Sequence, residues 1–129
     1  MKAKKILVVD DEERVREMLG FRLRLFGYEV VQAADGREAL EVAAREKPDL
    51  VLLDVMMPEL DGFQVCSRLK QDEATKHIPV VILTAKAEAK DVTRAVHSGA
   101  SDYLVKPYDP IVLQQKVARN LGKATGTSA

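Results

Sequence analysis

Four consecutive apolar residues, from Leu50 to Leu53, are followed directly by a carboxylate, Asp54. A run that is apolar at every position, rather than at alternate positions, is typical of a strand that is buried on both faces in the middle of a parallel sheet. Asp54 then lies at the C-terminal end of this strand, and in open α/β sheets ligands bind at that edge. The run therefore predicts a parallel α/β sheet with a charged side chain at its ligand-binding edge.

The composition limits the classes of protein and partner. The chain has 129 residues, the size of one domain, and 47% of them are hydrophobic, which is enough for a substantial core. Lys and Arg together number 20, as do Asp and Glu, so a net charge of zero gives no reason to expect nucleic acid or an anionic membrane as a partner. We find no apolar run long enough to span a bilayer and no signal-peptide pattern. The single cysteine, Cys66, excludes an internal disulfide and favours a cytoplasmic location.

Strand-like and helical patterns alternate along the chain. Apolar runs that predict strands lie at 6–9, 29–33, 50–53, 80–83 and 103–105, and helical periodicity lies at 12–26, 35–46, 62–71, 87–98 and 110–121. This strict alternation predicts a mostly parallel sheet with helices on both faces. The run at 29–33 is less apolar than the others, so we expect it at an edge of the sheet. The final stretch, 122–129, is small and polar, and we expect a flexible tail or the start of a linker there.

Several of the predicted helices begin at candidate capping residues. Asp10 or Asp11 can cap the first helix. Asp61 precedes the third helix and Gln64 follows three positions later, which is the spacing of a capping box. Asp109 precedes a proline at the first position of the last helix, a strong signal for a helix start. We expect these aspartates to accept hydrogen bonds from the first backbone N–H groups of their helices.

Four of the five predicted strands end in polar side chains, namely Asp10 and Asp11, Asp54, Thr84, and Lys106. Because the C-terminal ends of parallel strands lie on the same edge of a sheet, we expect these side chains to converge. Clustered carboxylates repel one another, so bringing them together costs energy unless a cation is present. Oxygen ligands favour Mg²⁺, held by one or two carboxylates plus waters. The pattern therefore predicts a magnesium site at this edge.

With these residues in place, the chain resembles the receiver domain of two-component response regulators over residues 5–121. The resemblance depends on five motifs that each follow a predicted strand in the expected order: Asp10-Asp11, Asp54, Met57-Pro58 with Asp61-Gly62, Thr84-Ala85, and Lys106-Pro107. Each motif alone is weak, but the five together are highly specific. The resemblance implies one receiver domain, residues 1–121, with a (βα)5 doubly wound parallel sheet of the flavodoxin-like or CheY-like type and strand order 2-1-3-4-5.

The resemblance also implies roles for the residues at the strand ends. Asp54 would be the phosphoacceptor, phosphorylated in a Mg²⁺-dependent reaction by a histidine kinase, a phosphotransfer protein or a small phosphodonor. The Mg²⁺ ligands would be Asp11 directly, Asp10 largely through water, Asp54, and the backbone carbonyl of Met56. Lys106 would pair first with Asp54 and then with a phosphoryl oxygen, as suits its compact ammonium group.

Two further residues would transmit the signal in a protein of this family. Thr84 would donate its hydroxyl to the phosphoryl group, and Tyr103 would turn inward as Thr84 moves. The face formed by the fourth helix, fifth strand and fifth helix would then bind an output domain or protein. We expect the Lys106–Pro107 bond to be cis, as in the family. Such a domain is not an enzyme beyond catalysing its own phosphorylation and dephosphorylation.

Two departures from the family concern oligomeric state and phosphoryl lifetime. In one DNA-binding subfamily the last helix carries an acidic residue and an arginine where this chain has Val112 and Lys116. A pair between Asp102 and Lys116 can still form, but the full set of salt bridges in that dimer cannot, so we expect a monomer or a weak phosphorylation-dependent dimer. Met56 and Lys86 occupy the positions that influence how long the phosphoryl group persists.

Two other classes of protein share part of this pattern. An aspartate-nucleophile phosphatase of the dehalogenase type needs a second aspartate two residues after the nucleophile, where this chain has Met56. A flavin-binding module of the flavodoxin type needs a Ser-, Thr- and Gly-rich loop after the first strand, whereas residues 10–13 are all acidic and would repel a phosphate. The phosphorylation-operated receiver therefore accounts best for the residues, either as a stand-alone protein or as part of a longer regulator.

Overall fold

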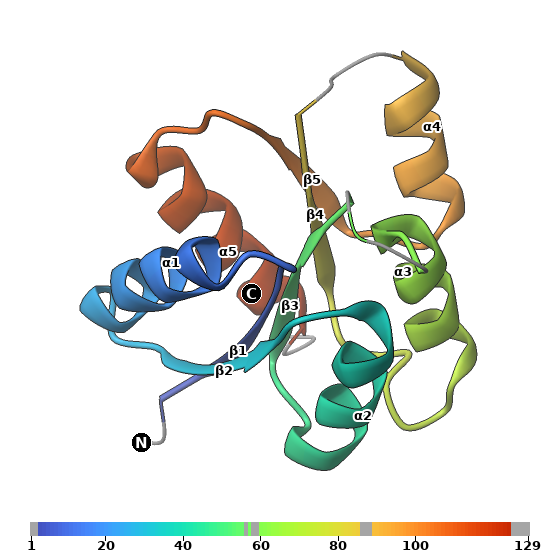
Figure 1. The fold of residues 1–129 in the computed structure, drawn as a ribbon, viewed down its shortest axis with the longest axis horizontal. Helices are drawn as coiled ribbons and strands as arrows, with labels where there is room; N and C mark the ends of the chain where they lie inside the picture. The colour runs from blue at the N-terminus through green and yellow to red at the C-terminus, as the bar shows by residue number, and fades with distance from the viewer. Residues whose placement is uncertain (1–2, 56, 58–59, 86–88, 125–129) are drawn as a thin grey trace.

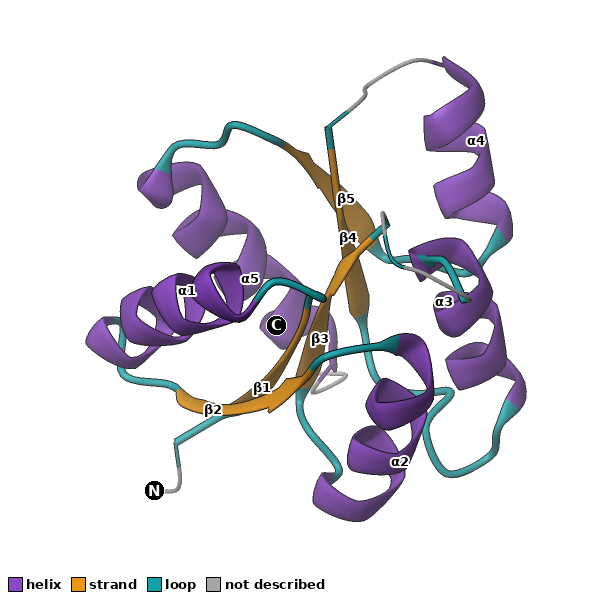
Figure 2. Cartoon of the chain, viewed as in Figure 1, coloured by secondary structure: helices purple, strands orange, loops and turns teal. Residues whose placement is uncertain are grey.

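The computed structural model describes residues 3–55, 57, 60–85 and 89–124. Its strands and helices alternate along the chain, as Figures 1 and 2 show. The strands are β1 (Lys5–Val9), β2 (Glu29–Ala33), β3 (Leu50–Asp54), β4 (Val80–Thr84) and β5 (Asp102–Val105). The helices are α1 (Glu13–Leu25), α2 (Gly36–Glu46), α3 (Gly62–Gln71), α4 (Ala89–His97) and α5 (Pro110–Ala124).

The five strands form one parallel sheet in the order β2-β1-β3-β4-β5, which confirms the predicted fold. Helices α1 and α5 cover one face of the sheet, and α2, α3 and α4 cover the other (Figure 1). The less apolar strand, β2, is at an edge as expected. Strand β3 lies in the centre, between β1 and β4, so both of its faces are covered by helices.

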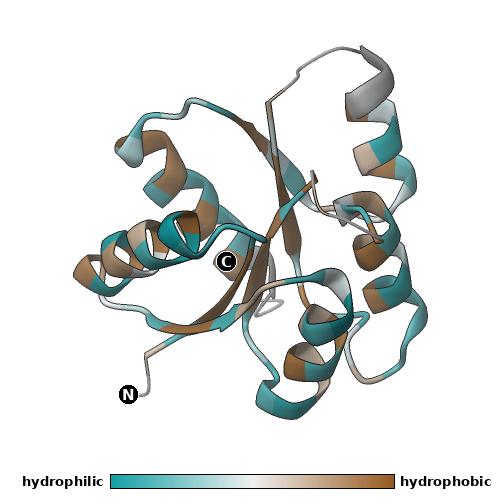
Figure 3. Cartoon of the chain, in the orientation of Figure 1, coloured by the Kyte–Doolittle hydropathy of each residue, from teal (hydrophilic) through white to brown (hydrophobic). Residues whose placement is uncertain are grey.

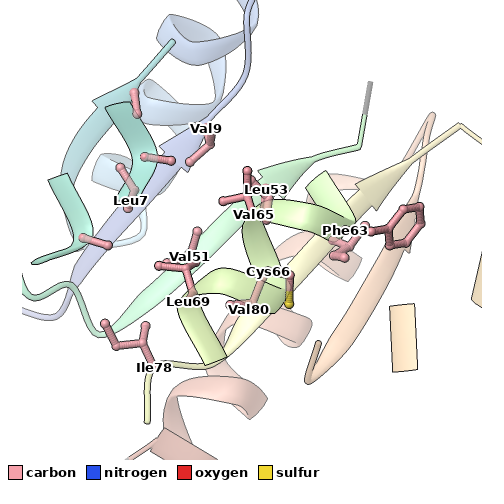
Figure 4. Close-up of a cluster of buried hydrophobic side chains, with 14 of the residues drawn as sticks. Leu7, Val9, Val51, Leu53, Phe63, Val65, Cys66, Leu69, Ile78 and Val80 are labelled. Carbon is pink, nitrogen blue, oxygen red and sulfur yellow. The ribbon is translucent and has the colours of Figure 1, made fainter. Parts of the chain in front are cut away.

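Side chains of β3 alternate between two hydrophobic cores. Leu50 and Leu52 belong to the core under α1 and α5, whereas Val51 and Leu53 belong to the core under α2, α3 and α4. All four residues have no exposed surface. Figure 4 shows the second core, in which side chains of α3 pack against β3, and Figure 3 shows how hydrophobic the strands are. Burial on both faces is the reason why this strand is apolar at every position.

Two predicted helix starts agree with the structure in detail. Asp61 Oδ1 accepts a hydrogen bond from the Gln64 N–H at 2.9 Å, and Gln64 Oε1 accepts one from the Asp61 N–H at 2.9 Å. This reciprocal pair is the predicted capping box of α3. At the last helix, Asp109 Oδ1 accepts a hydrogen bond from the Ile111 N–H at 2.7 Å.

The prediction that Asp10 or Asp11 caps the first helix is wrong. The N-cap of α1 is Glu12, whose side chain makes no capping hydrogen bond. Asp10 Oδ1 instead accepts a hydrogen bond from the Glu12 N–H at 2.9 Å, one residue before the helix begins. Strand β1 ends at Val9, so the two aspartates lie in the connection between strand and helix, where a carboxylate bonds the turn rather than the helix.

The last helix is longer than predicted, because residues 122–124 continue α5 instead of beginning the tail. One glycine costs a helix only about 1 kcal/mol, which is less than the burial of the apolar stripe that holds α5 on the sheet. That stripe is formed by the buried residues Leu113, Val117 and Leu121. The remaining tail residues, 125–129, and the predicted start of the fourth helix at 87–88 lie outside the described residues.

The central strand allows a test of this packing. Leu52→Ala should lower the free energy of unfolding by about 2–5 kcal/mol, because it leaves a cavity between β3 and the helices. The measurement is urea denaturation followed by circular dichroism. The control is Leu25→Ala, whose leucine is 69% exposed and which should change the free energy by less than about 0.5 kcal/mol. Similar effects in both variants would contradict the assignment of β3 to the core.

Candidate functional site

The structure brings polar residues from several strand ends to one edge of the sheet. Asp54 is the last residue of β3 and Thr84 the last of β4, while Asp10 directly follows β1 and Lys106 directly follows β5. The Lys106 Nζ atom lies 2.9 Å from Asp54 Oδ1 and 3.9 Å from Asp10 Oδ2. Parallel pairing thus places two carboxylates around one ammonium group, as the positions of these residues predict.

Asp10 is the most deeply buried carboxylate at this edge, with 1% of its surface exposed. Its Oδ1 atom accepts the hydrogen bond from Glu12, but its Oδ2 atom is buried and has no hydrogen-bond partner among the described residues. Burial raises the pKa of this carboxyl, and the nearby charges of Asp54 and Asp11 also raise it, against the lowering effects of the Glu12 N–H and of Lys106. An unpartnered buried oxygen needs an explanation, and a bound cation would supply one.

Three consecutive acidic residues follow β1 and could hold a metal ion. Asp10, Asp11 and Glu12 each have a carboxylate oxygen within 4.8 Å of the others. Asp11 and Glu12 are exposed, in contrast to Asp10. The two aspartates were predicted from the sequence as metal ligands, whereas Glu12 had no predicted role. The acidic run at residues 10–13 includes Glu12 and could have indicated a metal ligand. The same run is equally typical of the first turn of a helix, where acidic residues are common.

Arg16 is a second residue at this edge that the sequence analysis did not assign. Its Nη1 atom donates to the backbone carbonyl of Asp10 at 2.8 Å, and its Nε atom donates to Gln32 Oε1 at 3.3 Å. The guanidinium therefore ties α1 to the end of β1 and to β2. Nothing in the local pattern distinguishes Arg16 from the other arginines of this helix, because one partner lies on β2 and the other directly follows β1.

Backbone contacts set the positions of the other two strand ends. The Lys106 N–H donates to the carbonyl of Thr84 at 2.7 Å, which joins the residue after β5 to the end of β4. Thr84 is buried, and its neighbour in the sheet register is Val105. The Lys106–Pro107 peptide bond is cis, as expected. The Met56 carbonyl and the Lys86 side chain, to which the sequence analysis also gave roles, lie outside the described residues.

Gly62 explains why a glycine follows the cap of α3. A Cβ atom at this position would lie 2.5 Å from the backbone oxygen of Asp54 and 2.9 Å from the Cα atom of Val55. Only glycine therefore allows the start of α3 to approach the end of β3 so closely. The Gly62 N–H also donates to the carbonyl of Val55 at 3.1 Å, which holds the turn after Asp54 against the helix.

Comparison with known proteins identifies the family to which this arrangement belongs. The family model described as response regulator receiver domain matches residues 6–118. This chain belongs to the receiver domain family of response regulators. It is 47% identical over 114 residues to the alkaline phosphatase synthesis transcriptional regulatory protein PhoP of Bacillus subtilis, an alignment that covers 88% of this chain and 47% of PhoP. The chain thus spans about half the length of this curated relative.

Solved receiver structures have the same fold. The Vibrio cholerae chemotaxis protein CheY4 is 34% identical, with a TM-score of 0.88 over 92% of this chain and 99% of that one. The receiver domain of sensor histidine kinase PA1611 from Pseudomonas aeruginosa is 32% identical, with a TM-score of 0.86 over 94% of this chain and 99% of that one. That structure has a magnesium ion coordinated in its active site cleft.

In this receiver domain the predicted pair between Asp102 and Lys116 is present. Lys116 Nζ lies 2.9 Å from Asp102 Oδ1, and it also donates to the Tyr103 carbonyl at 2.7 Å. The same ammonium group lies 5.1 Å from the centroid of the Tyr103 ring, and Tyr103 packs partly buried against the core under α2, α3 and α4. Lys116 therefore connects α5 with the backbone and ring of the predicted switch residue.

The Asp102 carboxylate is held by several donors of α5. Besides Lys116, it accepts hydrogen bonds from Arg119 and from Asn120 Nδ2, the latter at 3.2 Å. Burial alone would raise the pKa of the Asp102 carboxyl, but the hydrogen bonds from Arg119, Lys116, the Tyr103 N–H and Asn120 outweigh it and hold the pKa far below its ordinary value. These contacts keep Asp102 engaged within one chain.

Among the described residues, no helix is long and apolar enough to cross a membrane.

Asp102 makes the stability of the domain depend on acid pH. Because its folded-state pKa is depressed, the carboxyl contributes stability above its ordinary pKa of 3.8, and this contribution is lost as the pH falls below that value. Asp102→Asn should lower the free energy of unfolding at pH 7 by about 1.5–3 kcal/mol, the usual contribution of a hydrogen bond to a charged group. In urea denaturation the difference from the parent should shrink below pH 3.8.

A difference of the same size at pH 7 and pH 3 would reject this account of Asp102. The control is Glu73→Gln, which removes an exposed pair and should have little effect.

Proposed function

We propose that Asp54 of this receiver domain accepts a phosphoryl group in a two-component signalling system. The observation that carries this proposal is the buried Asp54 carboxylate at the end of β3, with the Lys106 ammonium group 2.9 Å from one of its oxygens. A carboxylate is a competent nucleophile for phosphoryl transfer, and the neighbouring ammonium group can neutralise charge that develops on the transferred group. The donor would be a sensor histidine kinase, a histidine phosphotransfer protein or a small phosphodonor.

In the proposed reaction, one Asp54 oxygen bonds to the phosphorus atom of the donor. The bond between that phosphorus and the donor's nitrogen or oxygen breaks, and the leaving group keeps the electron pair. Lys106 then moves its contact from Asp54 to a phosphoryl oxygen, and the Thr84 hydroxyl donates to another. Little covalent chemistry is required of the protein, because the contribution of these side chains is positioning and charge stabilisation. The domain would catalyse only its own phosphorylation and dephosphorylation.

The donor atoms at this edge fit Mg²⁺, the ion coordinated in the PA1611 receiver structure. Asp10, Asp11 and Asp54 supply hard oxygen ligands, with the Met56 carbonyl as a further proposed ligand. The buried, unpartnered Oδ2 atom of Asp10 is the feature that a cation would satisfy. When bound, Mg²⁺ supplies positive charge opposite the phosphoryl oxygens. Asp11, exposed beside Asp10, would hold the ion directly, and Asp10 would hold it largely through water.

We propose that phosphorylation is read out on the face formed by α4, β5 and α5. The phosphoryl group would draw Thr84 toward it, and Tyr103 would turn inward. Lys116 already contacts Tyr103 and Asp102, so a movement of Tyr103 would alter the contacts that join β5 to α5. The partner on this face would be an output domain or protein, with the receiver as a monomer or a weak phosphorylation-dependent dimer in the cytoplasm. The receiver would occupy residues 1–121 and bind no nucleic acid itself.

The acceptor can be tested by substitution. Asp54→Asn should abolish labelling of the protein by acetyl phosphate in the presence of Mg²⁺, because the amide lacks the nucleophilic oxygen. The measurement is intact-protein mass spectrometry, which detects the added phosphoryl group. The matched control is Asp72→Asn, an exposed aspartate far along the chain, which should be labelled like the parent. Undiminished labelling of the Asp54 variant would move the acceptor to another residue.

The metal ligands can be tested without activity. Isothermal titration with Mg²⁺ should report one site in the parent and an affinity at least about tenfold lower in Asp11→Ala. Glu17→Ala removes an exposed carboxylate of α1, is the control and should bind like the parent. Equal affinity in all three proteins would reject Asp11 as a ligand.

A further inference from the structure

A polar groove lies between α3 and α4, on the face of the sheet opposite α1 and α5 (Figure 1). Its volume is about 440 Å³, within the range of cavities that bind small organic ligands. The lining residues come from one side of each helix: Phe63, Gln64, Ser67, Arg68, Gln71, Arg94, His97 and Ser98. None of the residues at the proposed phosphorylation edge is among them, so the groove is separate from that site.

The groove concentrates basic side chains in a chain with no net charge. Arg68 from α3 and Arg94 and His97 from α4 line it, and no aspartate or glutamate is among the lining residues that the structure describes. The other polar lining groups are amides and hydroxyls, which can donate hydrogen bonds. A groove of this composition is complementary to an anion.

Arg94 is held in a defined orientation. Its guanidinium carbon lies 4.3 Å from the centroid of the Phe63 ring, and Phe63 is buried near the start of α3 (Figure 4). Stacking of this kind orients the planar fork, and such a fork matches the oxygens of a phosphate or carboxylate group. Among the residues that the structure describes, Arg94 also forms a 3.4 Å pair with Asp61 Oδ2, in which the Arg94 side chain is 56% exposed. Exposed pairs of this kind contribute little free energy, so Arg94 keeps most of its capacity to bind an anion.

A simpler account is that these basic residues stabilise helix ends. Arg68 lies in the last turn of α3, and Arg94 and His97 lie in the last turn of α4, where positive charge is favoured by the helix dipole. The dipole accounts for a basic residue at each helix end. It does not account for basic residues of both helices lining one common groove, nor for the stacking of Arg94 on a buried ring.

We propose that the groove between α3 and α4 binds a small organic phosphate. Arg94 would hold the phosphate by its oriented guanidinium, and Arg68 would approach from the other helix. The ring N–H of His97 and the amide of Gln71 would contact the rest of the ligand. A phosphate ester is favoured over a protein segment because the groove has the volume of a small-molecule site and its basic groups come from only two helices.

The test is a titration of the ¹⁵N-labelled whole chain, followed by NMR in buffer without divalent metal. Adenosine diphosphate and pyrophosphate are the probes, because they offer phosphate groups with and without an organic part. We expect saturable shifts at the amides of Arg68, Arg94 and Ser98, with no comparable shifts at Asp10 or Asp54. The absence of metal keeps the acidic edge from binding these probes, so the result does not depend on the proposed phosphorylation of Asp54.

Substitutions make the test specific. Arg94→Gln and Arg68→Gln should each raise the dissociation constant at least about tenfold, the effect of losing a hydrogen bond to a charged group. Arg68→Gln serves if loss of the Arg94 stacking disturbs folding. Arg37→Gln, an exposed arginine of α2, removes the same charge elsewhere and should leave binding unchanged.

Three results would overturn the proposal. The first is the absence of saturable shifts with both probes. The second is an equal loss of affinity in the Arg37 variant and the groove variants, which would indicate non-specific charge attraction. The third is saturable binding of hexaglutamate but of neither phosphate probe, which would assign the groove to an acidic protein segment instead.

Discussion

The parallel pairing of four neighbouring strands is the constraint on which the site depends. In-register pairing of β1, β3 and β4 places Asp54 beside the connection that carries Asp10, and both side chains are almost fully buried. Two carboxylates in such a position repel each other, and burial adds a penalty for charge. The Lys106 ammonium group, at 2.9 Å from one and 3.9 Å from the other, is the positive charge within the described residues that offsets this repulsion. Burial is the largest cause that raises the pKa of the Asp10 carboxyl, and the charges of Asp54 and Asp11 add to it.

The charge balance at this edge would change when a ligand binds. One ammonium group faces two buried carboxylates, and Asp10 Oδ2 has no hydrogen-bond partner among the residues described. A cation at this edge would relieve the repulsion, and a phosphoryl group on Asp54 would change the charge that Lys106 faces. Because the Lys106 N–H is bonded to the Thr84 carbonyl, a shift of Lys106 would act on the ends of both β4 and β5. The electrostatic imbalance of the site is therefore linked to the strands that lead to α4 and α5.

The sequence predicts those features of the fold and site that depend on local pattern. The continuous apolar run before Asp54 identifies the central strand, and the spacing of Asp61 and Gln64 identifies the capping box of α3. Of the contacts between distant segments, the pairs Lys106–Asp54 and Asp102–Lys116 were expected from the family resemblance, and local pattern predicted none. Arg16 bonds to Gln32 on β2 and to the residue that follows β1, Asp10. The Asp10 carboxylate accepts a hydrogen bond in a turn rather than at the helix start that its position suggests. Such choices are decided by tertiary geometry, which no local pattern records.

The chain has no net charge, but it contains one region rich in negative charge and another rich in positive charge. Carboxylates gather where β1 and β3 end, whereas basic side chains line the groove at the C-terminal turns of α3 and α4. Helix α3 connects the two regions. Its first residue, Gly62, is pressed against the backbone of Asp54, and Arg68 in its last turn lines the groove. Because a helix is stiff along its length, an anion held between Arg68 and Arg94 would restrain the element whose start supports the end of β3. A ligand in the proposed groove would thus affect the end of β3, where Asp54 lies, through helix α3.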